Sequence, residues 1–86
     1  SVFEEDQFDQ MNRASWDLHM ETNLRAPLVL AQAFARRLPS DHEGLIVNVL
    51  DQRVWRLRPS FFSYTLSKAA LWDATRMLAL ALAPRI

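Results

Sequence analysis

The sequence predicts an α/β fold in which two long helices flank one buried strand of a parallel sheet. Apolar residues recur at spacings of three and four between residues 16 and 38, and a second helical run covers residues 61–83. Between them, Leu45–Leu50 is rich in branched apolar residues and shows no alternation with polar ones. Such a short apolar run is typical of a strand covered on both faces, as in a parallel sheet.

The first helix is expected to begin at Trp16, with Ser15 as its N-cap. Pro27 is expected to kink it, because proline lacks the backbone donor and crowds the preceding turn. The Leu38-Pro39-Ser40 sequence is expected to end it. One face of this helix carries residues at helical spacing: Trp16, Met20, Asn23, Pro27, Ala31, Phe34 and Leu38.

The second helix is expected to start at Phe61 or Ser63 and to run to Ala83, where Pro84 ends it. It has almost no polar face, which is typical of a helix buried on more than one side. One strand and one other helix are too few to cover it. We therefore expect it to pack against further parts of a larger fold or against a second copy of the chain.

Composition excludes several classes of function. The chain has 86 residues with ten basic and ten acidic side chains, so its net charge is zero, which argues against binding to nucleic acid or to a membrane surface. The chain has no cysteine, and His19 and His42 lie far apart in sequence, so no metal site is expected. Gly44 is its single glycine, so it does not carry a glycine-rich phosphate-binding loop.

Two segments of the sequence bear on where in the cell the protein is found: the N-terminal residues and the most apolar stretch. Residues 1–9 are polar and acidic, which is not typical of a secretory signal. The most apolar stretch, residues 69–84, is interrupted by Asp73 and Arg76 and is shorter than the roughly 20 residues of a membrane span. A cytoplasmic protein is expected.

Two polar residues interrupt the apolar pattern. Asn23 lies on the apolar face of the first helix, where it is either a functional group or a core amide bonded to a carbonyl freed near Pro27. Asp51 directly follows the predicted strand. It is either a turn or cap residue or part of a ligand site, because ligands in open α/β sheets bind beyond the carboxyl ends of strands.

Tyr64 and Lys68 are four residues apart, so they share one face of the second helix. A free tyrosine has a pKa of about 10, which is too high for acid–base work near neutrality. A nearby ammonium group would lower that pKa and would suit the phenol to donate a proton to a carbonyl oxygen. The alternative is an accidental pair on a solvated face, but this helix has little solvated face.

Together these residues resemble the short-chain dehydrogenase/reductase family over nearly the whole chain. Leu45–Val49 is similar to the family's fifth strand, and Asp51 precedes Tyr64 by the thirteen positions that separate two of the family's catalytic residues. The sequence Ser63–Leu71 resembles the family's tyrosine helix. Trp16-Asp17 with Asn23-Leu24 resembles the preceding helix, and Ser1 resembles the end of the motif that closes the fourth strand.

The resemblance implies a role for each site residue. Tyr64 is implied to be the general acid/base, Lys68 to bind the nicotinamide ribose and lower the tyrosine pKa, and Asn23 to hold a water in a proton relay. The family usually has serine where this chain has Asp51. Pteridine reductases are similar in having aspartate there, and a carboxyl group can pair with the amino and ring nitrogens of a pterin. An NADPH-dependent reductase of a pterin-like substrate is expected, with NADH, and a ketone or sugar carbonyl substrate, left open.

The resemblance further implies that residues 1–86 form the central-to-C-terminal part of one Rossmann-type domain, a doubly wound parallel sheet. They lack its glycine-rich N-terminal half and its C-terminal substrate loop. The chain by itself is then expected to be inactive. A homodimer or homotetramer through the two long helices is expected, and the rival hypothesis is a helical self-association module. Arg53 and Trp55 either line a flat substrate or pack on the surface.

Overall fold

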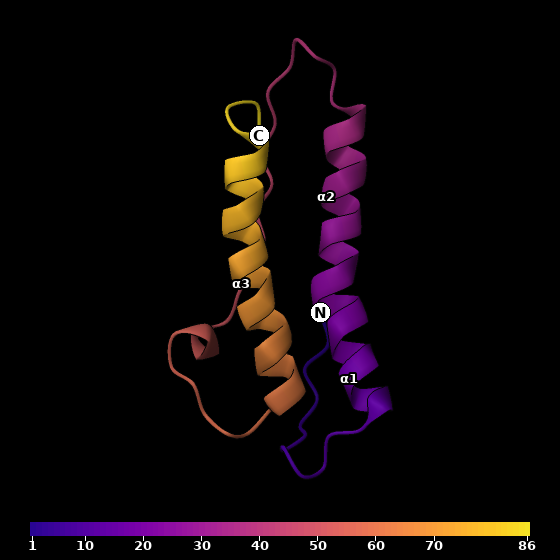
Figure 1. The fold of residues 1–86 in the computed structure, drawn as a ribbon, viewed down its shortest axis with the longest axis vertical. Helices are drawn as coiled ribbons and strands as arrows, with labels where there is room; N and C mark the ends of the chain where they lie inside the picture. The colour runs from indigo at the N-terminus through magenta and orange to yellow at the C-terminus, as the bar shows by residue number, and fades with distance from the viewer.

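The computed structural model describes all residues 1–86 as one layer of helices with extents of 49 × 25 × 15 Å. The element order is α1 (Arg13–Met20), η1 (Glu21–Arg25), α2 (Ala26–Arg37), η2 (Gln52–Val54) and α3 (Phe62–Leu82). Figure 1 shows α1 and α2 as one continuous rod beside α3, with both rods running in the same direction along the chain. The segment between them returns alongside α3.

The first helix starts earlier than the sequence predicts. Asn12, not Ser15, is its N-cap, and its side chain accepts from the Ser15 amide while the Ser15 hydroxyl accepts from the Asn12 amide. This reciprocal capping box satisfies two amides at the helix end. Ser15 is therefore the third helical residue, and its hydroxyl also reaches Asp6.

The backbone hydrogen-bond pattern of the first helical rod changes before Pro27. Across Glu21–Arg25 the chain forms a π-helix, and the amide of Ala26 donates to the carbonyl of Glu21, five residues earlier. Pro27 then stands in the first turn of α2, where its missing amide costs least. The structure thus has a π-helical segment just before Pro27 where the sequence predicts a kink at Pro27, and Asn23 lies in the middle of that segment.

The predicted strand is not observed. Residues 45–50 form no β-ladder, because no second strand lies beside them in this chain. Exposure alternates along the segment: Leu45, Val47 and Val49 are 80%, 74% and 75% exposed, and the residues between them are half-buried against the helices. The prediction of a strand covered on both faces is therefore wrong for this structure, in which one face stays open.

The segment is tied to both rods at a few points. The Asn48 amide donates to the Thr75 hydroxyl on α3 at 3.0 Å. Gly44 lies against the ring of Phe34 on α2 so closely that an added Cβ would come within 2.7 Å of it, so glycine suits this close approach. The segment accordingly fills the space between α2 and the upper part of α3 (Figure 1).

Helix α3 matches its predicted bounds, but its burial is uneven. Its first three turns contact α1 and η1, and they hold most of the molecule's buried residues: Ser63, Tyr64, Thr65, Ser67, Lys68 and Leu71. Its last turns leave Met77 and Leu80 at 69% and 86% exposure. Polar residues therefore dominate the buried centre, and no helix has the length and apolarity to cross a bilayer.

Candidate active site

Tyr64 and Asp51 are directly joined. The buried phenol of Tyr64, 6% exposed, donates to Oδ2 of Asp51 at 2.8 Å. The other oxygen of Asp51, Oδ1, accepts from the amide of Arg53 at 2.9 Å and so caps η2. Asp51 is therefore a cap residue, which is one of its two predicted roles, and the same carboxylate also binds the phenol of Tyr64.

Lys68 lies one turn after Tyr64 and is also buried. Its ammonium donates to the carbonyl of Val49 at 2.9 Å, which anchors α3 to the extended segment. An ammonium has three donors, so two remain for other partners. Lys68 and Asn23 line the same cavity of about 220 Å³, together with residues of the extended segment and of the N-terminus.

Asn23 joins three parts of the chain. Its Oδ1 accepts from the Val2 amide at 2.7 Å, and its Nδ2 donates to the Val2 carbonyl at 2.8 Å and to the Ser67 hydroxyl at 3.1 Å. Ser67 in turn donates to the carbonyl of Tyr64 at 2.6 Å. Asn23 is a satisfied buried amide, but its partners are Val2 and Ser67, not a carbonyl freed near Pro27.

The electrostatics of Tyr64 differ from the expectation. Burial, the hydrogen bond to Asp51 and the charge of Asp51 raise the pKa of Tyr64 from 10.0 to about 12, and Arg53 opposes them. The expected lowering by Lys68 is wrong for this structure, because the ammonium is bonded to Val49 and the partner of the phenol is a carboxylate. The site holds Tyr64 as a neutral donor.

The pKa values of the two charged residues of the site, Asp51 and Lys68, are both lowered. The amide of Arg53 and the hydroxyl of Tyr64 donate to the Asp51 carboxylate, which lowers the pKa of Asp51. Burial lowers the pKa of Lys68, and the negative charge of Asp51 counteracts it. The centre is thus a carboxylate, a protonated phenol and a desolvated cation within two turns of α3 and the end of the extended segment.

A second buried cluster was not found from the sequence. Asp6 is 5% exposed, and its carboxylate accepts from the Ser63 amide, the Ser63 hydroxyl and the Ser15 hydroxyl at 2.8, 2.6 and 2.7 Å. It caps the start of α3 from 57 residues away, where Phe61 has no capping side chain. No local pattern marks such a long-range cap.

In the sequence, His19 stands out only as a potential metal ligand, yet in the structure it is fully buried beside this cluster. Its Nε2 lies 3.2 Å from the Glu4 amide and its Nδ1 lies 2.8 Å from the Ser15 carbonyl, so Nδ1 carries the donated proton. The four-residue spacing of Ser15, His19 and Asn23 within an apolar face was the signal that could have revealed a buried polar stripe.

The site also carries an aromatic stack. The rings of Phe3 and Phe61 are stacked with centroids 4.2 Å apart, and Phe3 meets the edge of Tyr64 at 4.5 Å. Phe61 takes the left-handed conformation, with φ 52°, as it turns the chain into α3. The guanidinium of Arg53 lies 4.9 Å from the Phe61 centroid.

Residues 2–86 match the family described as short chain dehydrogenase. The chain belongs to that family. It is 33% identical over 70 residues to human dehydrogenase/reductase SDR family member 4, covering 81% of this chain and 25% of the relative. It is 32% identical over 71 residues to gluconate 5-dehydrogenase of Gluconobacter oxydans, covering 83% of this chain and 28% of the relative.

Among solved structures, this family member is similar to FolM alternative dihydrofolate reductase 1 of Brucella suis, determined in complex with NADP. The identity is 56% and the TM-score is 0.97, and the match covers all of this chain and 36% of the other. The present chain thus spans between a quarter and just over a third of the proteins it matches.

Proposed function

We propose that this chain carries the proton-transfer centre of an NAD(P)H-dependent reductase, with Tyr64 as the general acid. The observation that carries the proposal is the 2.8 Å hydrogen bond from the buried phenol to Asp51. A substrate atom that takes the place of the Asp51 oxygen would meet a donor that is already oriented. Membership in a family of dehydrogenases supports the same activity.

The raised pKa of Tyr64 fits an acid that must keep its proton until the substrate is in place. Two of the causes that raise it come from Asp51. When the carboxylate turns to the substrate, both weaken, and the phenol becomes a stronger acid. Arg53, whose charge lowers the pKa of Tyr64, is the cation near enough to stabilise the resulting tyrosinate.

The residues present fit a nicotinamide cofactor, and we propose NADPH. Lys68 has two free ammonium donors on a cavity of about 220 Å³ that it shares with polar side chains, which suits the hydroxyls of a ribose. The bound cofactor would supply the hydride. The NADP complex of the 56% identical Brucella protein favours NADPH over NADH. Gly44 is the only glycine among residues 1–86. We therefore expect the pyrophosphate of the cofactor to be bound by residues outside this segment.

The proposed substrate is pterin-like. A carboxylate accepts two hydrogen bonds side by side, so Asp51 can pair with a ring N–H and an adjacent amino group, which a serine hydroxyl cannot do. The similarity to a protein described as an alternative dihydrofolate reductase supports this choice. The second candidate is a sugar or ketone carbonyl, which the similarity to gluconate 5-dehydrogenase favours.

We also propose self-association through α2 and α3. Large apolar side chains stand exposed on both helices, among them Leu30, Phe34, Met77 and Leu80. Soluble monomers rarely expose so many large apolar side chains to solvent. The rival hypothesis, a self-association module without catalysis, shares this surface but gives the buried Tyr64–Asp51 pair no role.

The test is Tyr64→Phe in the complete reading frame that encodes this chain. NADPH oxidation with dihydrofolate or a dihydropterin should fall about 100-fold or more, because general acid catalysis contributes about 10²–10⁴-fold. Thr65→Val, one residue along α3 and bonded only to the Phe61 carbonyl through its hydroxyl, is the matched control and should keep most of the rate. Unchanged reduction by Tyr64→Phe would reject the enzyme hypothesis and favour the self-association module.

A further inference from the structure

The loop between Asp51 and α3 concentrates positive charge in a chain that is neutral overall. Residues 52–60 hold three arginines and no carboxylate, whereas the whole chain has ten basic and ten acidic residues. The three arginines and Gln52 line a cavity of about 130 Å³ that contains no hydrophobic residue. Such a surface is unfavourable for a non-polar ligand and favourable for an anion.

The arginines of this loop lack acidic partners. Elsewhere, Arg13, Arg25 and Arg76 each pair with an acidic residue three or four positions away on the same helix, whereas Arg36, Arg37 and Arg85 form no ion pair. Arg56 and Arg58 are exposed, and neither forms an ion pair. Their charges are therefore uncompensated by the protein.

Arg53 fixes one wall of the cavity. Its guanidinium donates to the carbonyl and hydroxyl of Ser60 at 3.2 and 3.4 Å and lies over the ring of Phe61. These contacts hold a half-buried guanidinium in one orientation and leave its other nitrogens free. A fixed guanidinium loses less entropy when it binds a ligand than a free one does.

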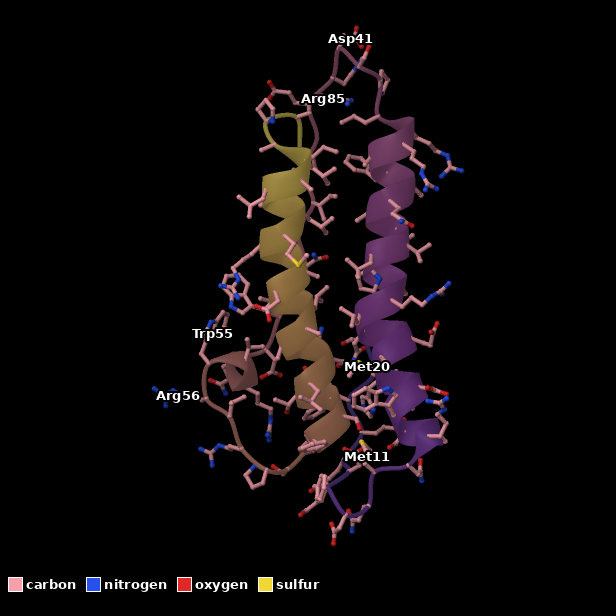
Figure 2. All side chains as sticks on the ribbon, in the orientation of Figure 1. Met11, Met20, Asp41, Trp55, Arg56 and Arg85 are labelled. Atoms are coloured by element: carbon pink, nitrogen blue, oxygen red, sulfur yellow. The ribbon has the colours of Figure 1, made fainter.

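The cavity borders the proposed reaction centre. The backbone of Arg53 donates to Asp51, and the charge of Arg53 lowers the pKa of both Asp51 and Tyr64. Figure 2 shows Trp55 and Arg56 projecting outward from this loop, on the side of α3 away from α1 and α2. A ligand whose ring is held at Asp51 could therefore extend over the loop without meeting the helices.

We propose that Gln52, Arg53, Arg56 and Arg58 bind a carboxylate tail of the substrate whose ring Asp51 holds. The inference rests on the proposed function and narrows its substrate class to ring compounds that carry a distal carboxylate. A planar guanidinium donates two parallel N–H bonds to a carboxylate, and arginine is more weakly hydrated than lysine, so this loop suits such a tail. Arg53 supplies the fixed wall, and Arg56 and Arg58 supply the charges that can move toward the ligand.

The kinetic test uses the double variant Arg56→Gln/Arg58→Gln in the complete reading frame. Dihydrofolate, which ends in a dicarboxylate, is compared with dihydrobiopterin, which has no carboxylate. The KM for dihydrofolate should rise about tenfold more than the KM for dihydrobiopterin, since charge-assisted hydrogen bonds are roughly twice as strong as neutral ones. Arg36→Gln/Arg37→Gln, which removes two charges at the end of α2, is the control and should leave the KM ratio unchanged. Equal rises for both substrates, or no rise, would overturn the proposal.

A binding experiment separates this site from the activity. The same protein is titrated calorimetrically with p-aminobenzoylglutamate, which is the tail alone, and with inorganic phosphate. The tail should bind, its affinity should fall about tenfold in Arg56→Gln/Arg58→Gln, and phosphate should bind more weakly than the tail. Two results would overturn the assignment of these arginines to a carboxylate tail. One is an affinity for phosphate equal to that for the tail, and the other is tail binding that does not change in Arg56→Gln/Arg58→Gln. Arginine-dependent binding of the tail without any pterin reduction would reject the proposed function and retain the anion site.

Discussion

The phenol of Tyr64 and the carboxylate of Asp51, thirteen residues apart in the chain, share a hydrogen bond of 2.8 Å. It connects the first turns of α3 to the end of the extended segment, and Lys68 makes a second connection one turn later through the Val49 carbonyl. The two contacts fix the position of a neutral donor, a carboxylate and a cation relative to one another. They also make the state of Tyr64 depend on what Asp51 binds.

The first prediction is that Tyr64 titrates with a pKa of about 12 instead of 10.0. It is the only tyrosine of the 86-residue chain, so near-ultraviolet absorbance of tyrosinate reports on it alone. At pH about 11, roughly a tenth of the folded chain should be ionised, against about nine-tenths of the chain in urea.

The sign of this shift also has a consequence for stability. Because the folded pKa is raised, the contribution of Tyr64 to stability is present below the unfolded value of 10.0 and is lost as the pH rises through about 12. Asp51→Asn removes the negative charge, so the pKa should move toward 10.0 but stay above it, since burial remains. A folded chain that titrates near 10.0 would contradict the hydrogen bond on which the site is built.

The second prediction concerns the choice of substrate. Asp51→Ser, in the complete reading frame, should lose most of its dihydropterin turnover, because a hydroxyl cannot accept two hydrogen bonds from a ring N–H and an amino group. A loss of about 10²-fold or more in kcat/KM is expected, since a site that leaves polar substrate groups unpaired discriminates strongly. Turnover of simple ketones should rise or stay level in the same variant. Retained pterin reduction would favour the sugar or ketone hypothesis.

The centre of the site could be predicted in part from the sequence. Tyr64 and Lys68 share one helix face, and the resemblance to the family, through the thirteen positions between Asp51 and Tyr64, added Asp51 to them. The strand itself could not be confirmed, since a β-ladder needs a partner strand, and residues 45–50 have none here. The direction of the Tyr64 pKa shift was also missed, because it depends on Asp51 being the phenol's partner.

The residues that hold the centre together were harder to find. The bonds from Asn23 to Val2 and from Asp6 to Ser63 span 21 and 57 residues, and neither pair has a local pattern. The start of α1 at Asn12 was missed for a different reason. Asn12 and Ser15 can both cap a helix, and in the structure Asn12 is the N-cap while the Ser15 hydroxyl donates to the Asp6 carboxylate.

The third prediction concerns Ser67, whose hydroxyl accepts a hydrogen bond from Asn23 and donates one to the backbone carbonyl of Tyr64. Ser67→Ala removes one of the two acceptors of the Asn23 amide nitrogen, so one buried N–H of Nδ2 loses its partner while the other still donates to the Val2 carbonyl. The free energy of unfolding of the complete protein should fall by about 1–3 kcal/mol. Ser40→Ala, at an exposed turn, is the control and should change it by less than about 0.5 kcal/mol. Equal stabilities of the two variants in a urea titration would show that the Asn23–Ser67 contact contributes nothing.

The fourth prediction is that Asp6 stabilises the start of α3 in a pH-dependent way. Burial raises its pKa, but the hydroxyl and amide of Ser63 and the hydroxyl of Ser15 outweigh burial, so the pKa lies below 3.8. The group therefore contributes stability above the unfolded pKa, and that contribution is lost as the pH falls through the folded value.

Asp6→Asn should accordingly lower the free energy of unfolding by about 1–3 kcal/mol at neutral pH, because the amide offers one acceptor where the carboxylate uses two. The gap between wild type and variant should narrow as the pH falls below about 4. Asp9→Asn, an exposed acid three residues along the same segment, is the control and should show no such gap. Urea titrations at neutral and acidic pH measure the difference, and a gap that persists unchanged at low pH would mean that the negative charge of Asp6 does not stabilise the helix end.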